Sequence, residues 1–328
     1  MENNDKIVLE LENLLRRAKE VRERLNIQSN AYRLVNGQSD GLTGLIIERF
    51  NNHFQIQISD AKWFVLIDKI KSILLNTYPV QYIVLRHRIG EDGPLPKAEL
   101  KVIFEKDNCG AITVIQEGPH QFKIDMLNPI HPGIYLDSRV IRHKITKDSQ
   151  GKKVLNAFSF TASYGVYAKG KGAIFTCNVD MSPKILEKAK ENYKLNGLEM
   201  AESEFVRADV RDYLKVCATK KFLFDVIILD QMPNSAKTNR GNFNAKDELP
   251  ELIQASMKVL TSRAELFVST TSPDVTIKIL QQWVESSAYQ NRYDIEKTVI
   301  YHRDADFTTD SSLKETNFNA LWVRLSKK

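Results

Sequence analysis

Cysteine is scarce in this chain of 328 residues, which has three: Cys109, Cys177 and Cys217. Because they are odd in number and widely spaced, they indicate neither a disulfide framework nor a zinc site. Long apolar runs are also lacking, since no stretch approaches the roughly 18 consecutive apolar residues of a membrane span. The first residues, Met1 to Asp5, are polar and acidic. We therefore expect no signal peptide, no membrane span and a reduced, cytoplasmic setting.

The size and charge of the chain set further bounds. A chain of this length with 42% hydrophobic residues can bury a full core and is expected to hold two domains. The net charge of +6 and the pI of about 9.0 suit a polyanionic partner such as RNA. An excess this small is also common in proteins that never contact nucleic acid, so charge alone leaves the partner open.

Apolar residues recur at steps of three and four from Ile7 to Leu25, which predicts an amphipathic helix within an N-terminal segment of residues 1–28. The basic residues on this helix could line a path for RNA, but the interleaved Glu20 and Glu23 favour an ordinary solvated face. Residues 29–125 are expected to form a smaller central α+β domain, because short strand-like runs such as Leu45–Phe50 and Phe54–Ile58 alternate there with turn-rich segments.

From residue 126 to residue 328 the rhythm of the chain changes. Short apolar runs expected to be strands alternate with longer helical patterns, the clearest of which cover 182–195 and 248–260. Such alternation implies right-handed crossovers and a mostly parallel sheet covered on both faces. The predicted fold class is therefore α/β, a Rossmann-like doubly wound domain preceded by the smaller α+β domain. The expected strands are 154–158, 173–179, 204–207, 226–229 and 265–268.

Three aspartates follow successive predicted strands: Asp180, Asp209 and Asp230. In a doubly wound sheet the ligand lies beyond the carboxyl ends of the strands. Asp180 is placed to accept both ribose hydroxyls of an adenosine ligand, Asp209 its adenine amino group, and Asp230 lies nearest the reacting centre. Each aspartate alone could be a turn former or a helix cap, and Ser182 and Pro183 are expected to begin the helix after Asp180. Three aspartates in this order favour a site.

These segments resemble bacterial 23S ribosomal RNA methyltransferases of the RlmI type, which act on cytosine C5, and their RlmK-type guanine relatives. The resemblance begins at Ser29–Gly37, continues through Gly133–Arg139, and covers Val154–Thr161, Val179–Ser182 and Glu204–Val210. It implies a class I methyltransferase domain with S-adenosylmethionine as donor, and RNA, by family ribosomal RNA, as partner. A homodimer is left open. The implied donor-binding residues are Arg139, Asn156, Phe158, Thr161, Asp180, Met181, Asp209, Val210 and Asp230; the expected RNA contacts in the central domain are Arg33, Arg49, Arg86, His87 and Arg88.

The chain departs from this family at three places. Thr161-Ala162-Ser163 stands where the family has Thr-Gly-Gly, and Asp230-Gln231-Met232-Pro233-Asn234 where it has Asp-Pro-Pro and an aromatic residue. Ser269-Thr270-Thr271 stands where the family has Ser-Cys-Ser. Cytosine C5 accepts a methyl group only after an enzyme thiolate adds at C6, so the usual cytosine mechanism is not expected.

Two functions agree with these departures. The first is a methyltransferase acting on RNA at an atom that needs no cysteine nucleophile, such as a guanine or amine nitrogen; its catalytic residues stay unassigned. The second is an inactive protein of methyltransferase fold that binds RNA or associates with the ribosome. Donor binding separates the two functions at their first step.

Overall fold

In the computed structural model, residues 2–90, 93–231, 244–308 and 318–328 are described, and the chain divides into two compact units. The first unit contains Met1–Arg139 together with Asp304–Ser312, so a late segment of the chain returns to it. The second unit contains Val140–Arg303 and Leu313–Lys328. Among the described residues, no helix is long and apolar enough to cross a membrane.

The first unit is built on a five-stranded sheet. Its strands stand in the order β1 (Ala31–Asn36), β2 (Leu45–Phe50), β3 (His53–Ile58), β4 (Tyr82–Gly90) and β5 (Gly93–Glu105), and only β3 and β4 pair in parallel. The apolar side chains of α1 (Glu2–Arg24) and α2 (Ile67–Thr77) pack with one face of this sheet. A separate hairpin follows, formed by β6 (Ile112–Glu117) and β7 (His120–Asp125). The α+β class of the smaller domain is therefore confirmed, and α1 covers the predicted helical segment, while the unit extends to Arg139 instead of residue 125.

A buried ion network holds the returning segment within the first unit. Asp306, which is fully buried, accepts hydrogen bonds from the Arg33 amide at 2.8 Å and from the Arg139 guanidinium at 2.7 Å. Arg139 also pairs with Asp304, and Arg22 donates to the Asp306 carbonyl oxygen at 3.0 Å. Because each charge has an opposite charge or a backbone partner, the network avoids the cost of an unpaired buried ion.

The second unit is the expected doubly wound domain. Its seven strands stand in the order β10-β9-β8-β11-β12-β14-β13. The pairs among β8 to β12 are parallel, whereas β14 runs antiparallel to both of its neighbours. The fold class is confirmed, and the β13 and β14 pair adds two strands to the five that were expected. The strands are β8 (Lys153–Ala157), β9 (Phe175–Asp180), β10 (Phe205–Arg207), β11 (Phe224–Gln231), β12 (Leu260–Thr270), β13 (Tyr293–Tyr301) and β14 (Asn319–Lys327).

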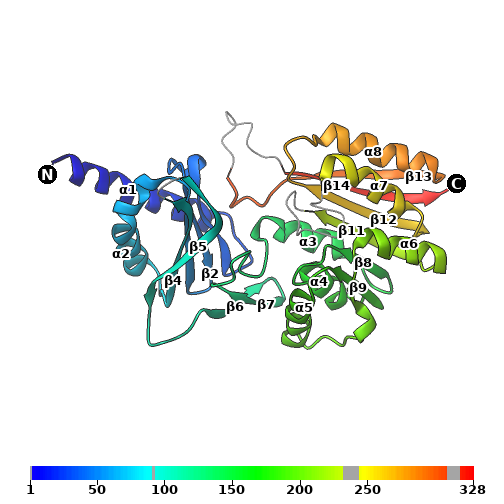
Figure 1. Cartoon of the computed structure of the whole chain (residues 1–328), viewed down its shortest axis with the longest axis horizontal. Helices are drawn as coiled ribbons and strands as arrows, with labels where there is room; N and C mark the ends of the chain where they lie inside the picture. The colour runs from blue at the N-terminus through cyan, green and yellow to red at the C-terminus, as the bar shows by residue number, and fades with distance from the viewer. Residues whose placement is uncertain (1, 91–92, 232–243, 309–317) are drawn as a thin grey trace. The chain divides into compact units, whose positions relative to one another are not determined.

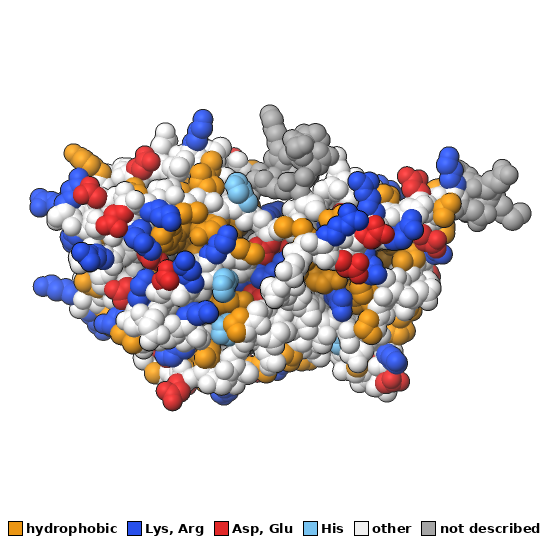
Figure 2. All heavy atoms as spheres, turned by 180° about the vertical axis from the view of Figure 1, so that it is seen from behind, with side chains coloured by type: hydrophobic (Ala, Val, Ile, Leu, Met, Phe, Trp, Pro, Cys, Tyr) orange, Lys and Arg blue, Asp and Glu red, His pale blue; other side chains and the backbone are white. Residues whose placement is uncertain are grey.

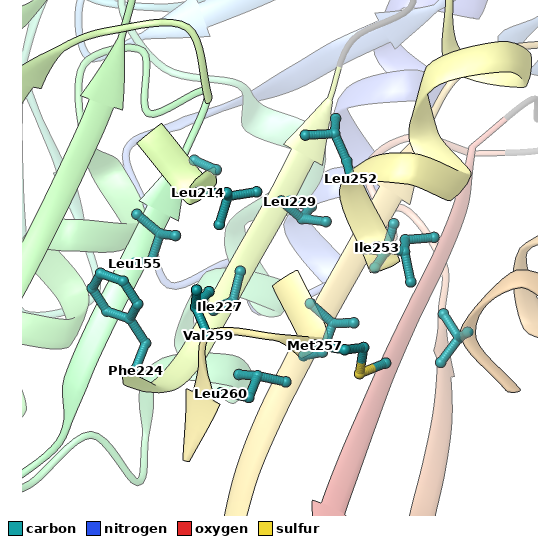
Figure 3. Close-up of a cluster of buried hydrophobic side chains, with 14 of the residues drawn as sticks. Leu155, Leu214, Phe224, Ile227, Leu229, Leu252, Ile253, Met257, Val259 and Leu260 are labelled. Carbon is teal, nitrogen blue, oxygen red and sulfur yellow. The ribbon is translucent and has the colours of Figure 1, made fainter. Parts of the chain in front are cut away.

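Helices cover both faces of this sheet (Figure 1). On one face, α6 (Val210–Lys220), α7 (Ala245–Met257) and α8 (Ile277–Gln290) bury the main apolar core, part of which is shown in Figure 3. Leu155, Ile227 and Leu229 of the sheet meet Leu214 of α6 and Leu252 of α7 there. The other face is covered by α3 (Arg139–Thr146), α4 (Ser163–Gly170) and α5 (Pro183–Leu195), where apolar and polar contacts are mixed.

Candidate donor-binding site

The strand order of the second unit reverses between β8 and β11, where a doubly wound sheet binds its ligand. β8 pairs in parallel with both β9 and β11, so their carboxyl ends meet at one edge. The residues that follow these ends are the loop 158–162 after β8, Asp180 at the end of β9, and Asp230 at the end of β11. The predicted aspartates thus lie at the sheet edge where an adenosine ligand is expected.

The loop after β8 follows a path that normally requires glycine. Phe158, Phe160 and Ala162 have φ angles of +54°, +49° and +61°, in the left-handed region. Each costs a residue with a Cβ roughly 1–2 kcal/mol. Ala162 is fully buried directly before α4. Ala162 therefore has a backbone conformation that favours glycine, and the chain holds the strained turn by other contacts.

Asp180 is one of those contacts. Its Oδ2 accepts a hydrogen bond from the Phe160 amide at 3.1 Å, and its Oδ1 accepts one from the Ser182 amide at 2.9 Å. Ser182 caps α5 through its side chain and Pro183 occupies the first turn, as expected. Burial raises the pKa of Asp180 above its ordinary value, although the backbone hydrogen bonds oppose this shift. A half-buried carboxylate of this kind gains from further hydroxyl donors, which a ribose would supply.

Asp209 both caps a helix and carries an ion pair. Its side chain accepts the Arg211 amide at 2.9 Å at the start of α6, and the Arg211 guanidinium contacts both carboxylate oxygens. Arg211 also contacts Glu248 in the first turn of α7. The hydrogen bond to Asp209 is the main reason that the pKa of Arg211 is raised. Arg211 was not among the predicted residues, because a basic residue two positions after an aspartate is an unremarkable pattern.

The edge between β11 and β12 carries the expected reacting end. Asp230 stands opposite Ser269 in the parallel register, and the Ser269 hydroxyl donates a hydrogen bond to Asp230 Oδ1. Thr270, which occupies the place of the family cysteine, is fully buried and its Oγ1 accepts the Ser272 amide at 3.1 Å. Thr270 is therefore not presented as a nucleophile. Residues 232–234 of the altered loop lie outside the described residues.

The other predicted donor residues have different surroundings. Phe158 packs against the main core, Val210 is buried within it, and Met181 is 37% exposed beside Asp180. Thr161 is buried, and its carbonyl oxygen accepts a hydrogen bond from Asn192 Nδ2 of α5 at 3.0 Å. These four residues lie at or next to the carboxyl-end edge of the sheet in the second unit.

The side chains of Asn156 and Arg139 bind other residues of the protein. Asn156 is 1% exposed, and its Nδ2 donates to Asn178 Oδ1 on β9 at 3.0 Å, beneath the loop. Arg139 is the last residue of the first unit before the crossing and its guanidinium binds Asp304 and Asp306. Both side chains therefore act in internal networks of their units.

Most of the arginines expected to contact RNA are used inside the first unit. Arg33 pairs with Glu48 at 2.7 Å, and its guanidinium lies over the Phe307 ring at 4.2 Å. Arg49 lies over the Tyr78 ring, and Arg86 donates to the carbonyl oxygens of residues 128–130.

The remaining two expected RNA contacts differ in exposure. His87 is buried, whereas Arg88 is exposed. Figure 2 shows Lys and Arg interspersed with Asp and Glu on the face it displays. Of the five predicted contacts, Arg88 is therefore the one most open to an external phosphate.

None of the three cysteines occupies the place of the family cysteine, which is Thr270. Cys177 in β9 and Cys217 in α6 are buried, and burial raises the pKa of Cys177 to about 12. Cys109 is exposed but belongs to the first unit. A thiol with so high a pKa is a poor source of thiolate. Neither buried cysteine is suited to add to a pyrimidine.

Together the reversed strand order and the carboxylates define a Rossmann-like domain with a candidate ligand-binding edge. The sequence signature of S-adenosylmethionine-dependent methyltransferases matches residues 81–290. The chain belongs to this family of enzymes, and its methyl donor is S-adenosylmethionine.

Curated relatives and solved structures agree with this assignment. The chain is 34% identical to ribosomal RNA large subunit methyltransferase I of Aeromonas hydrophila over 287 residues and 27% identical to that of Aliivibrio fischeri over 284 residues. Both matches cover 87% of this chain and 72% of the relative. A protein described as a methyltransferase, solved with SAH, superposes with a TM-score of 0.83 at 21% identity, covering 97% of this chain and 81% of that one. This last likeness shows the shared fold.

Proposed function

We propose that this enzyme transfers the methyl group of S-adenosylmethionine to RNA, and specifically to large-subunit ribosomal RNA, in the cytoplasm. The RNA substrate is supported by the names of the curated relatives and by the net charge of +6. The observation that carries the donor half of the proposal is the contact of Asp180 with the Phe160 amide, which joins a carboxylate to a glycine-like loop.

In this proposal the sheet edge holds the donor through a short set of residues. Asp180 accepts the ribose hydroxyls, and Asp209 accepts the adenine amino group. Phe158, Met181 and Val210 supply apolar surface for the purine, and the loop at Thr161 accommodates the amino acid part. Arg139 and Asn156 are left out of the contact set, because their side chains already bind Asp306 and Asn178.

The proposed acceptor is a base nitrogen. The nitrogen lone pair forms the new N–C bond while the sulfonium S–C bond breaks, and the electron pair of that bond stays on sulfur. An amine acceptor releases one proton, which a carboxylate at the reacting edge can take up. Asp230 occupies that position, and Ser269 donates to its Oδ1. The enzyme needs to hold donor and acceptor in line, and no covalent intermediate is required.

Donor titration is the first test. We expect isothermal titration to show S-adenosylmethionine binding at micromolar concentrations, and Asp180→Asn to weaken it while Asp294→Asn, an exposed change in the same unit, leaves it unchanged. Absence of donor binding at high micromolar concentration would overturn the donor half of the proposal.

Methyl transfer is the second test. Label from a tritiated donor is expected at one nucleotide of ribosomal RNA purified from cells that lack the protein. Donor binding with no label transferred would contradict methyl transfer to ribosomal RNA. RNA containing 5-fluorocytosine traps a thiolate that has added at C6, so a covalent protein–RNA adduct would contradict the assignment of a nitrogen acceptor.

A further inference from the structure

A buried hydrogen-bond chain lies beneath the donor loop, on the face of the sheet covered by α4 and α5. Asn178 of β9 stands at its centre: its Oδ1 accepts from Asn156, and its Nδ2 donates to the Tyr193 hydroxyl of α5 at 3.0 Å. The Tyr193 hydroxyl also bonds Thr176 Oγ1 at 2.8 Å, and Glu204 accepts from the Thr176 amide at 2.8 Å. Asn178 and Tyr193 are both fully buried, so these hydrogen bonds have no competition from water.

Helix α4 packs directly against these hydrogen-bonded side chains. A Cβ built on Gly165 would lie 2.3 Å from Asn178 Oδ1 and 2.6 Å from the Tyr193 hydroxyl oxygen. Both distances are shorter than any van der Waals contact, so only glycine lets α4 rest at this depth. The positions of the Asn178 amide and the Tyr193 hydroxyl therefore set where the start of α4 can lie.

The start of α4 is also the end of the donor loop. Ala162, with a φ of +61°, leads directly into Ser163, the first residue of α4. From the other side, Asn192 holds the Thr161 carbonyl oxygen at 3.0 Å, and Asn192 precedes Tyr193 on α5. Any shift of Tyr193 against β9 is thus transmitted to the loop through α4 and through α5.

We propose that Tyr193 and Asn178 are positioning residues for methyl transfer, which fix α4 through Gly165 and thereby hold the loop 158–162 in its donor-binding conformation. This inference rests on the proposed role of that loop in binding S-adenosylmethionine. Neither side chain contacts the donor in the proposed site; each acts through the position of α4.

The test removes one buried hydroxyl. In Tyr193→Phe, Asn178 Nδ2 loses its 3.0 Å partner and keeps only carbonyl contacts at 3.4 Å. A buried hydrogen bond contributes about 1 kcal/mol, which corresponds to about a fivefold change in an equilibrium constant. We expect the Kd and the KM for the donor to rise about fivefold while the KM for RNA stays unchanged. The matched control is Tyr293→Phe, which removes a buried hydroxyl bonded to the Leu260 and Thr261 carbonyl oxygens of the same unit.

This control separates a loss of global stability from a loss of donor affinity caused by misplacing the loop. Both variants are expected to lower the urea midpoint, but only Tyr193→Phe is expected to weaken donor binding. Gly165→Ala provides a second variant that keeps every hydrogen-bonding group, and its collision with Asn178 is expected to weaken donor binding more than tenfold. The inference would be overturned, and the proposed function left standing, if Tyr193→Phe or Gly165→Ala bound the donor as tightly as the wild type. The same holds if Tyr293→Phe lost as much donor affinity as Tyr193→Phe. A wild-type protein that binds no donor would overturn the proposed function as well.

Discussion

The Phe160 amide donates a hydrogen bond to Asp180 Oδ2 at 3.1 Å, so the loop after β8 is joined directly to the carboxylate at the end of β9. A change in the charge of Asp180 therefore acts on the loop as well as on a ribose bound as proposed. Because burial raises the pKa of Asp180, this charge is lost at a higher pH than that of an ordinary aspartate.

Donor binding should accordingly depend on pH through Asp180. In the proposed site, ionised Asp180 accepts the ribose hydroxyls, so affinity is expected to fall as the pH drops through the raised pKa, above the ordinary aspartate value of about 3.9. For the ligand-free protein the sign is opposite: the folded state binds this proton more tightly than the unfolded chain, so the contribution of Asp180 to stability falls as the pH rises through the same window. Titrations from pH 4 to 8 measure the first effect.

The variant Asp180→Asn provides the control for this pH profile. It is expected to bind the donor about tenfold to a hundredfold more weakly, since hydrogen bonds to a charged group contribute about 1.5 to 3 kcal/mol. Its remaining affinity should not vary with pH in that window. A pH profile shared by the wild type and the variant would assign the titration to another group.

Ala162→Gly is expected to stabilise the protein. Ala162 has a φ of +61°, and glycine adopts this conformation without the steric cost of a Cβ. We expect the free energy of unfolding to increase by about 1 kcal/mol, measured by urea denaturation. The same substitution at Ala168, also fully buried but within α4, should instead cost about 1 kcal/mol or more. A loss of stability in Ala162→Gly would show that the methyl group of Ala162 contributes more packing than strain.

The sequence predicted the sheet because its signals are local. Each parallel strand is a short apolar run, and Asp180 and Asp230 follow strands directly, so their place at the sheet edge follows from topology alone. The strands β13 and β14 were missed because they follow the last described helix, α8, as an antiparallel pair, outside the strand–helix alternation that identified the other strands. The hydrogen bonds of Asn156 and Arg139 were missed because their partners Asn178 and Asp306 are set by tertiary packing.

Asp306→Asn tests the network that holds the returning segment in the first unit. Asp306 is fully buried and binds the Arg139 guanidinium, so its neutralisation leaves a buried cation with reduced compensation. We expect a loss of about 3 kcal/mol in the unfolding free energy, as for other buried pairs that lose one partner. The exposed pair of Asp294 and Lys328 supplies the comparison, since Asp294→Asn should cause no measurable change. Equal urea midpoints for the two variants would contradict a stabilising role for the network.

In the proposed site, Arg211 competes with the donor for Asp209. The Arg211 guanidinium and amide supply hydrogen bonds to both oxygens of the Asp209 carboxylate, so an adenine amino group must share an acceptor that is already engaged. In Arg211→Gln the charge and the two-pronged contact are lost, which leaves Asp209 a stronger acceptor. We expect this variant to bind S-adenosylmethionine about threefold to fivefold more tightly, a gain of about 1 kcal/mol, typical of one hydrogen bond.

The donor analogue in which hypoxanthine replaces adenine isolates this effect, because it has no amino group to donate to Asp209. Its affinity should be the same for Arg211→Gln and for the wild type, so the preference for adenine should grow in the variant. Arg211→Lys keeps the charge but not the planar fork that contacts both oxygens. Its affinity for S-adenosylmethionine should lie between those of the wild type and Arg211→Gln. A uniform loss of affinity for both donors would instead show that Arg211, through its contacts with Asp209 and Glu248, organises the site rather than competing for it.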